Sequence, residues 1–345
     1  MKSKKKKGFF DEEFRREKIE SKDPLKKLNS RVNWEQFRRT LEKAFSEIDY
    51  SQGGRPPYDR VMMFKILLLQ EYYGVSDDQM EFQLLDRLSF QSFIGQGLHD
   101  QVPDAKTIWL FRETLSKTGT IDKLFEQLKK QLDQIGLIAH KGKIVDASFA
   151  EVPIQRNTPK ENQKLKDGEI PNWKENKLRQ KDTEADWTKK NNQSHFGYKK
   201  HIKADSKSKL ITNFEITPAS VHDSQVLEEL LEKRDIGQPI YGDSAYYSNE
   251  IIETLQRGGF KPKILEKGYR NKPLTKKQKE RNKKLSSTRC RVEHVFAWMR
   301  QHTGYIVRGI GIVRVTAKTT LQIIGYNLSR AVYLITHHRK RVSII

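Results

Sequence analysis

Cysteine is almost absent from this chain of 345 residues. The single thiol, Cys290, excludes an internal disulfide framework and a zinc site built on cysteines. So little cysteine is typical of a protein from a reducing compartment. We interpret Cys290 itself as inert, because no base is placed beside it in the sequence to make it a nucleophile.

Long apolar runs are also missing. No stretch approaches the ~18–20 apolar residues that a membrane span needs. The basic start at residues 1–7 is not followed by the apolar core of a signal peptide. Hydrophobic residues make up 35% of the chain, which is enough for packed cores but low for this length. We therefore expect a soluble intracellular protein with some exposed stretches.

Acidic residues are scarce relative to basic ones. The chain has 44 Asp and Glu against 66 Lys and Arg, a formal net charge of +22. This balance favours a polyanion as partner, with nucleic acid as the first candidate. The positive charge is clustered, since residues 261–284 contain eleven Lys and Arg and only two acids. Clustering argues against a merely basic, inert surface.

The N-terminal part divides into a charged arm and a helical region. Residues 1–30 mix charges of both signs, and Lys4–Lys7 fits a solvated tail as well as a DNA contact. Residues 31–135 show helical periodicity, with Ser76 and Asp104 at predicted helix starts. Short helices joined by turns fit a helix-turn-helix DNA reader, an ordinary bundle or a dimerisation surface. Periodicity does not choose among the three.

The texture changes after this region, and residues 136–340 are predicted to form a second domain. Its expected strands are 141–149, 196–202, 210–216, 239–244 and 260–265, and its expected helices are 221–232, 248–257 and 316–335. An early hairpin followed by strands alternating with helices predicts a mixed sheet with helices packed on it. Residues 155–193 are a polar insertion that we expect to be mobile or to order only on binding.

Three acids stand at informative places in this pattern. Asp146 lies late in the first strand, Asp243 ends the fourth, and Glu293 lies on the helix after the last strand. In a sheet of this order the two strands can lie side by side, and a packed helix can add the third acid. Three carboxylates in one place repel unless a cation joins them, and Mg²⁺ or Mn²⁺ prefers oxygen ligands. Ordinary surface charge is the alternative, and residue patterns alone leave both open.

The helix predicted over residues 289–300 carries the third acid beside two cations. On a helical wheel Arg289, Glu293 and Arg300 share a narrow arc. The apolar stripe beside that arc consists of Leu285, Val292, Phe296 and Met299. A carboxylate held beside packed apolar residues and flanked by cations suits a metal-assisted phosphate site.

The chain resembles the DDE transposases of bacterial insertion sequences, of the insertion-sequence-five type. The resemblance rests on the order of several motifs from about residue 30 to residue 335. They are PDAKTIWLFR from Pro103, IVDASF from Ile144, DTEADWT from Asp182, FGYKKH from Phe196, ITPASVHDS from Ile216, YGDSAY from Tyr241 and the Arg289/Glu293/Arg300 helix. Singly these motifs are weak, but together their order is specific.

The resemblance implies an RNase H-like catalytic core with a mixed α/β sheet, preceded by an all-α N-terminal domain. It assigns catalysis and metal binding to Asp146, Asp243 and Glu293, with two Mg²⁺ or Mn²⁺ ions. Within the family's Tyr/Arg/Glu/Lys signature, Arg300 stands where Lys is usual and Ser286 where Tyr is usual. The expected DNA contacts are Arg289, Arg300, Lys106, Arg112, Lys276, Lys277 and Arg308.

The implied activity is cleavage at terminal inverted repeats, followed by attack of the freed 3′-hydroxyl on target DNA. The implied partners are double-stranded DNA and a second copy of the chain, with no membrane and no small-molecule cofactor. The implied setting is the bacterial cytoplasm, in association with the nucleoid. A structure-specific nuclease with the same core, or a DNA-binding protein that has lost catalysis, are the alternatives.

Other polar residues have structural explanations. We expect Asp223 to cap the helix that follows it and Asp205 to sit in a turn. His195 and His201 flank a strand and lack metal-ligand spacing. We interpret His222, a lone histidine beside a helix start, as structural, with a place near the site as the alternative. Two tryptophans of the polar insertion, Trp173 and Trp187, are expected to anchor it on the core, with base stacking as the alternative.

Overall fold

The structure of this chain is a computed structural model that describes residues 22–46, 53, 56–97, 100–190, 192–304 and 306–337. The chain divides into two compact units, residues 1–127 with 331–345 and residues 128–330. The basic run Lys4–Lys7 and most of the predicted arm lie outside the described residues. In the described part of the chain, no helix is long and apolar enough to cross a bilayer.

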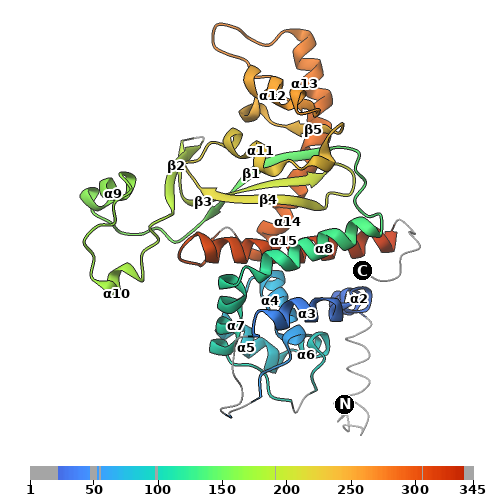
Figure 1. Ribbon diagram of the computed structural model, residues 1–345, viewed down its shortest axis with the longest axis vertical. Helices are drawn as coiled ribbons and strands as arrows, with labels where there is room; N and C mark the ends of the chain where they lie inside the picture. The colour runs from blue at the N-terminus through green and yellow to red at the C-terminus, as the bar shows by residue number, and fades with distance from the viewer. Residues whose placement is uncertain are drawn as a thin grey trace, which may run out of the picture. The chain divides into compact units, whose positions relative to one another are not determined.

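The N-terminal unit is helical and is built around one buried helix. Its elements are α2 (Pro24–Arg31), η1 (Trp34–Phe37), α3 (Arg38–Lys43), α4 (Arg60–Tyr73), α5 (Asp77–Asp86), α6 (Leu88–Ile94), α7 (Ala105–Lys117) and the start of α8 (Thr120–Gln134) (Figure 1). Most side chains of α4 are buried, and Phe64 contacts the rings of Trp34 and Phe37. Helix α4 ends at Gly74, whose φ of 62° is the left-handed conformation that glycine adopts without strain.

The second unit contains a six-stranded mixed sheet. Its strands are β1 (Lys143–Glu151), β2 (Asp186–Lys190), β3 (Gln193–Asp205), β4 (Ile211–Pro218), β5 (Pro239–Gly242) and β6 (Lys261–Ile264). The order is β2-β3-β1-β5-β6, and β4 also pairs with β3. Strands β1, β3 and β4 are antiparallel neighbours, whereas β5 and β6 run parallel to β1. The expected α/β fold, an RNase H-like core with a mixed sheet and flanking helices, is confirmed.

Helices cover the sheet on both sides. Figure 1 shows α11 (Leu227–Leu230) and α12 (Asn249–Arg257) on one side, with α14 (Glu293–Thr303) and α15 (Ile312–His337) on the other. Asn327 of α15 accepts a hydrogen bond from the N–H of Ile211 and donates one to its carbonyl, which fixes the start of β4.

The predicted helix over residues 221–232 is much shorter than expected. A 3₁₀ turn, η2 (Asp223–Val226), precedes α11, which ends at Leu230. The side-chain amide of Asn213 donates hydrogen bonds to the carbonyls of Glu229 and Leu230. Those carbonyls are thereby satisfied outside the helix, and Leu231 adopts an extended conformation.

The polar insertion contains more regular structure than its composition predicts. It includes α9 (Pro159–Lys166), α10 (Glu175–Leu178) and β2, which pairs with β3. Trp173 donates from its indole N–H to Glu161, so it packs within the insertion rather than on the core. Trp187 does reach the core, because its ring lies 5.0 Å from that of Phe196 on β3.

A buried cluster of charges, which we call the ionic cluster, joins β1, β3 and η3 (Lys233–Asp235). Its members are Lys143, Lys203, Asp205, Glu232 and Asp235. Lys203 Nζ lies 2.7 Å from Glu232 Oε2 and 2.5 Å from Asp235 Oδ2. Asp205 also binds N–H groups of the β3–β4 turn, which confirms its predicted turn position and gives it a second role.

The ionic cluster predicts an acid-sensitive contribution to stability. Partial burial alone would raise the pKa of Glu232, but Lys203, Lys129 and Arg234 outweigh it and lower that pKa to about 2. A carboxyl whose folded pKa lies below its unfolded value stabilises the fold above the unfolded pKa, and loses that effect as pH falls toward the folded pKa.

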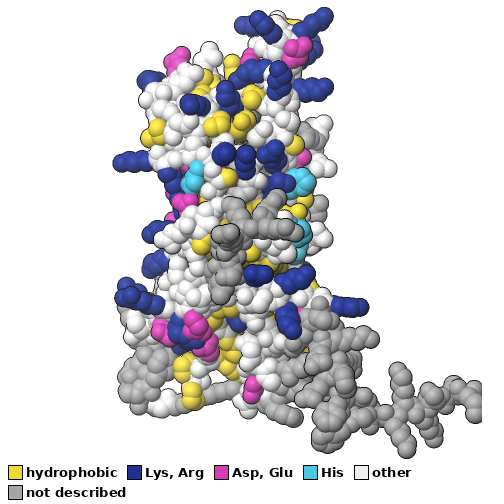
Figure 2. All heavy atoms as spheres, turned by 90° about the vertical axis from the view of Figure 1, so that its right-hand side faces the viewer, with side chains coloured by type: hydrophobic (Ala, Val, Ile, Leu, Met, Phe, Trp, Pro, Cys, Tyr) yellow, Lys and Arg dark blue, Asp and Glu magenta, His cyan; other side chains and the backbone are white. Residues whose placement is uncertain are grey.

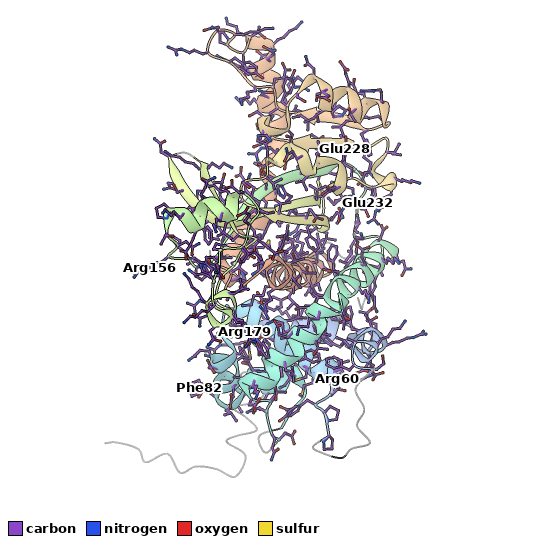
Figure 3. The ribbon with its side chains drawn as sticks, turned by 60° about the vertical axis from the view of Figure 1, so that its left-hand side comes forward. Arg60, Phe82, Arg156, Arg179, Glu228 and Glu232 are labelled. Carbon is purple, nitrogen blue, oxygen red and sulfur yellow. The ribbon has the colours of Figure 1, made fainter. Side chains whose placement is uncertain are left out.

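We therefore expect Glu232→Gln to lower the melting temperature at pH 7, with the deficit shrinking as pH falls from 4.5 toward about 2. The measurement is the melting temperature of both proteins across this range. Glu228→Gln is the matched control, because Glu228 lies nearby at an exposed position (Figure 3). A deficit that does not change with pH would contradict the assignment.

Candidate active site

Two of the three predicted acids lie side by side at the same edge of the sheet. Strands β1 and β5 pair in parallel, with Ile144 opposite Tyr241. Asp146 stands two residues beyond Ile144, and Asp243 stands two residues beyond Tyr241. Because side chains alternate along a strand, the equal offset directs both carboxyl groups the same way. Asp243 directly follows β5 and accepts a hydrogen bond from the N–H of Ala245.

The third acid is carried by a helix that is broken just before it. The single helix predicted over residues 289–300 consists of α13 (Lys276–Arg289), one 3₁₀ turn, η5 (Cys290–Val292), and α14, which begins at Glu293. The buried side chains of η5 and α14 are Val292, Val295, Phe296 and Met299. Residues at the break keep right-handed helical φ and ψ, so the spacing of the predicted arc survives.

Arg289 links the acid on the sheet to the acid on the helix. Its Nη1 donates to Asp146 Oδ2 and its Nη2 donates to Glu293 Oε1, each at 2.9 Å. The Asp146 side chain is 15% exposed, whereas that of Glu293 is 60% exposed. One guanidinium therefore draws both carboxylates toward the same point, and Glu293 stays open to solvent.

The electrostatics at Asp146 show that negative charge is undercompensated. Burial, opposed by Arg289 and assisted by the neighbouring Asp243, raises the pKa of Asp146 to about 6. Two neighbouring carboxyl groups resist full ionisation unless a cation joins them. Additional positive charge would therefore stabilise the ionised carboxylates of this site.

A buried tyrosine beside the acids is the site residue that sequence patterns miss. Tyr246 is fully buried in the turn after Asp243, and its hydroxyl has no hydrogen-bond partner among the described residues. Burial raises its pKa well above the ordinary value, and Asp223, Asp146 and Asp243 act in the same direction. The sequence motif indicates only that Tyr246 packs near Asp243, because an unpartnered hydroxyl is a property of the folded site.

The donor set fits a hard divalent cation. All three acids offer carboxylate oxygens, which Mg²⁺ and Mn²⁺ prefer. Two buried polar groups beside them, the Tyr246 hydroxyl and Arg289 Nε, have no partner among the described residues. Within that same part of the chain, no three His, Cys, Asp or Glu side chains form a ready-made metal-binding group. Here Arg289 supplies the positive charge between two of the acids.

Most of the predicted DNA-contacting residues lie on the surface. Arg300, Lys106, Lys276, Lys277 and Arg308 are exposed. Helix α13 buries none of its side chains, although Arg281 and Asn282 tie it to Glu266. Figure 2 shows Lys and Arg side chains gathered at the upper end of its view, where α13 and the loop before it lie in Figure 1. Such a helix offers its cations to a polyanion.

Arg112 is different from the other predicted contacts. Its guanidinium makes two hydrogen bonds to the carboxylate of Asp77 and one to Gln70, and its side chain is only 12% exposed. It joins α7 to α4 and the start of α5. A guanidinium committed to an internal ion pair is not presented to DNA, so Arg112 is removed from the expected interface.

The remaining candidates are structural. The prediction that Asp223 caps the following helix is wrong, because His222 Nδ1 accepts the N–H of Ser224. Asp223 instead pairs with Lys199 at 2.9 Å. The other two histidines bind neighbouring strand residues: His195 binds Glu151 and His201 binds Thr217.

Two transposase family models match this chain. Residues 138–328 match the model of the transposase DDE domain, and residues 13–114 match a second model, Transposase domain (DUF772). The first match covers more than half of the chain and contains all three acids. The chain belongs to the transposase DDE domain family. It is a DDE-type transposase, an enzyme of DNA transposition and recombination, and its family generally uses divalent metal ions.

One solved structure is similar at a distance. It is a cryo-EM structure of the piggyBac transposase synaptic complex with hairpin DNA, 12% identical in sequence, with a TM-score of 0.44. The alignment covers 95% of this chain and 76% of the other. A similarity this weak carries no weight for the site or its partners.

Proposed function

We propose that Asp146, Asp243 and Glu293 are the catalytic, metal-binding acids of this transposase. The observation that carries the proposal is the pairing of β1 with β5, which sets Asp146 beside Asp243 at the edge that Arg289 connects to Glu293. Mg²⁺, as two ions, is the proposed cofactor, with Mn²⁺ as a substitute. When bound, such ions activate the attacking oxygen and stabilise the leaving oxygen in phosphodiester displacement.

The proposed reaction has two steps on double-stranded DNA. Water attacks a phosphorus at the end of the element, the P–O3′ bond breaks, and a free 3′-hydroxyl remains. That hydroxyl then attacks a phosphorus of target DNA and displaces a second 3′-oxygen. Asp146 and Asp243, both partly buried at one edge of the sheet, would provide a pair of ligands, whereas the more exposed Glu293 can adjust when the metal and DNA arrive.

The proposed DNA contacts lie in both units. In the second unit, Lys276, Lys277, Arg300 and Arg308 would contact backbone phosphates, and in the N-terminal unit Lys106 would do so. Arg289 donates hydrogen bonds to both Asp146 and Glu293, so its guanidinium could also bind a phosphate that enters between these two carboxylates. We further propose that two copies of the chain form a homodimer on DNA and hold the two ends of one element. The proposed location is the cytoplasm, in association with the nucleoid.

The test is a strand-transfer assay on oligonucleotide duplexes that carry the terminal inverted repeats bounding this reading frame. With Mg²⁺, we expect nicking at the repeat end followed by joining of that end to a second duplex. Nicking without joining would indicate a nuclease with the same core. Metal-independent DNA binding without nicking in Mg²⁺ or Mn²⁺ would indicate a protein that has lost catalysis.

Tyr246 provides a separate prediction about this site. We propose that its unpartnered hydroxyl donates a hydrogen bond to an oxygen held among the acids in the working complex. Tyr246→Phe removes no bond present in the structure, so its melting temperature should not fall. We expect the Mg²⁺ concentration for half-maximal cleavage to rise about 10-fold or more, as for other residues that support metal ligands.

The measurement is cleavage rate against Mg²⁺ concentration, together with Mn²⁺ binding followed by electron paramagnetic resonance. Tyr247→Phe is the matched control, because Tyr247 is the next residue and packs against the same core. If the two variants share one metal dependence, Tyr246 is only a core residue.

A further inference from the structure

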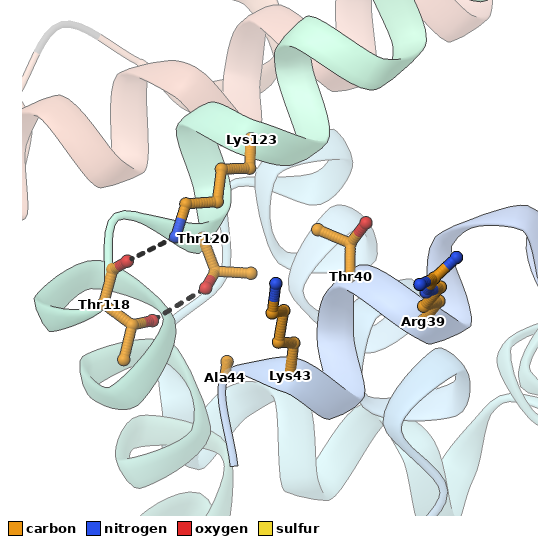
Figure 4. A pocket seen from close by; sticks show the side chains of 7 residues that line it. All are labelled: Arg39, Thr40, Lys43, Ala44, Thr118, Thr120 and Lys123. Carbon is orange, nitrogen blue, oxygen red and sulfur yellow. Dashed lines mark hydrogen bonds between the residues drawn. The ribbon is translucent and has the colours of Figure 1, made fainter. Parts of the chain in front are cut away.

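Away from the acids, three cationic side chains surround a cavity in the N-terminal unit. The cavity has a volume of about 320 Å³. It is lined by Arg39, Thr40, Lys43, Ala44, Thr118, Thr120 and Lys123 (Figure 4). No acidic residue is among them. The volume is at the lower end of the ~300–1,000 Å³ typical of ligand pockets, so a small anionic group fits it.

The cavity has two walls whose separation is fixed by hydrogen bonds. One wall is α3, where Arg39 and Lys43 lie one turn apart on the same face. The other is the turn between α7 and α8. The Thr40 hydroxyl donates to Gln127 Oε1 of α8, and Gln127 Nε2 donates to the carbonyl of Gln36, each at 2.8 Å. The cations are therefore held around a fixed opening.

The second wall adds hydrogen-bonding groups to the cations. Thr118 and Thr120 place their hydroxyl oxygens 2.8 Å apart, and Lys123 Nζ lies 3.3 Å from the Thr118 carbonyl. Figure 4 shows the Lys43 side chain reaching from α3 toward this turn. The turn leads into the N-terminus of α8, where the helix dipole also favours an anion. All of these features favour negative charge in the cavity.

Three acids in or near α3, Glu35, Glu42 and Asp59, all pair with Arg38. Arg38, next to Arg39 in sequence, is paired with Glu35 and Asp59, each at 2.5 Å. In the part of the chain that the structure describes, neither Arg39 nor Lys43 has an acidic partner within 4 Å, and both are exposed. Like charges around one opening repel, and a bound anion would relieve that repulsion.

We propose that this cavity binds a backbone phosphate of duplex DNA. The proposal rests on the proposed function, since it supplies a phosphate contact in the N-terminal unit that neither the predicted contacts nor the acids include. Arg39, Lys43 and Lys123 provide the charge, while the Thr118 hydroxyl, which donates to the Thr114 carbonyl, and the Thr120 hydroxyl bonded to it form the polar second wall. Contacts of this kind position a duplex and do not read its sequence.

The test measures binding of the full chain to a random-sequence duplex in EDTA, by fluorescence anisotropy at several salt concentrations. The test variant combines Arg39→Gln, Lys43→Gln and Lys123→Gln. Its control combines Lys22→Gln, Lys27→Gln and Lys117→Gln, which removes the same charge from exposed positions of the same unit. Melting temperatures verify folding, and a variant with Arg39→Lys, Lys43→Arg and Lys123→Arg keeps the charge of the cavity.

We expect the test variant to bind at least about tenfold more weakly than the control, with a salt slope smaller by about 1 for each phosphate that the variant no longer binds. The charge-keeping variant should stay close to wild type. Equal affinities and slopes for the test variant and the control would overturn the proposal. A second pair of results would also overturn the proposal. If inorganic phosphate raises the melting temperature of wild type but not of the test variant, while the test variant and the control bind DNA equally, then the cavity binds free phosphate and not DNA.

The two proposals fail differently. Binding in EDTA does not require chemistry, so a wild-type protein that binds through the cavity but never cuts its terminal repeats contradicts only the proposed function. A wild type that cuts normally, with a test variant indistinguishable from the control, contradicts only the cavity.

Discussion

Asp243→Ala is expected to abolish cleavage of a terminal-repeat duplex while leaving DNA binding intact. Asp243 follows β5 directly and shares an edge of the sheet with Asp146, so its loss removes one of the proposed ligands for the metal. We expect the rate to fall by at least about 10³-fold, the scale on which enzymes lose activity when a central catalytic group is removed. DNA affinity should hold or increase slightly, because a negative charge leaves the interface.

Glu293→Gln tests whether the charge of this side chain, rather than its size, is needed for cleavage. The amide keeps the size of the side chain but loses a metal ligand and the ion pair with Arg289. We expect a comparable loss of cleavage, again with DNA binding preserved. Glu253→Gln, on α12, is the control for removing one carboxylate elsewhere in the same unit. Cleavage at the wild-type rate by Asp243→Ala or Glu293→Gln would refute the assignment of the acids.

The placement of the acids could be predicted because it depends on strand order. Alternation of strands and helices after residue 210 indicates that β5 and β6 run parallel to β1, and parallel strands carry their carboxyl ends at one edge. Asp146 and Asp243 each fall late in a predicted strand, so local patterns allow them to meet, and the pairing of β1 with β5 in the structure brings them together. The helix caps at Ser76 and Asp104 could also be predicted, because each depends on a local contact: the side chain accepts a hydrogen bond from the N–H three residues later.

What sequence patterns could not predict depends on partners far away in the chain. Lys203 looks like a solvated strand residue, yet it is buried because Glu232 and Asp235 come to it from another element. The order within the polar insertion depends likewise on the pairing of β2 with β3. His222 took the capping role predicted for Asp223 because Lys199, on β3, binds that carboxylate. Propensity is local, and these outcomes are set by tertiary contacts.

The ionic cluster yields the largest expected effect on stability. Lys203→Met should destabilise the protein by about 3–5 kcal/mol, because removal of one partner leaves a buried charge uncompensated. Asp235 would keep a hydrogen bond from the N–H of Glu232, but its nearest cation would be Lys143, whose Nζ lies 3.8 Å from an Oδ1 that lacks a hydrogen-bond partner among the described residues. The measurement is the free energy of unfolding by urea at pH 7, followed by tryptophan fluorescence.

Two further variants test this cause. Arg179→Ala breaks an ion pair between exposed side chains on the same unit, and should change stability by no more than about 0.5 kcal/mol (Figure 3). Combining Lys203→Met with Asp235→Leu removes both charges and should recover part of the loss, because no buried carboxylate at that position remains unpaired. Single and double variants that are equally unstable would mean that the volume of Lys203, rather than its charge, supports the fold.

The same cluster links stability to the active site. Lys143 lies three residues before Asp146 on β1, and Asp235 lies four residues before β5, the strand that ends at Asp243. The ion pairs of Asp235 with Lys143 and Lys203 therefore connect β1 to the segment that leads into β5. We expect Lys203→Met to lose cleavage activity at temperatures well below its melting temperature, because the pairing of β1 with β5 is loosened. The double variant should regain cleavage activity together with stability.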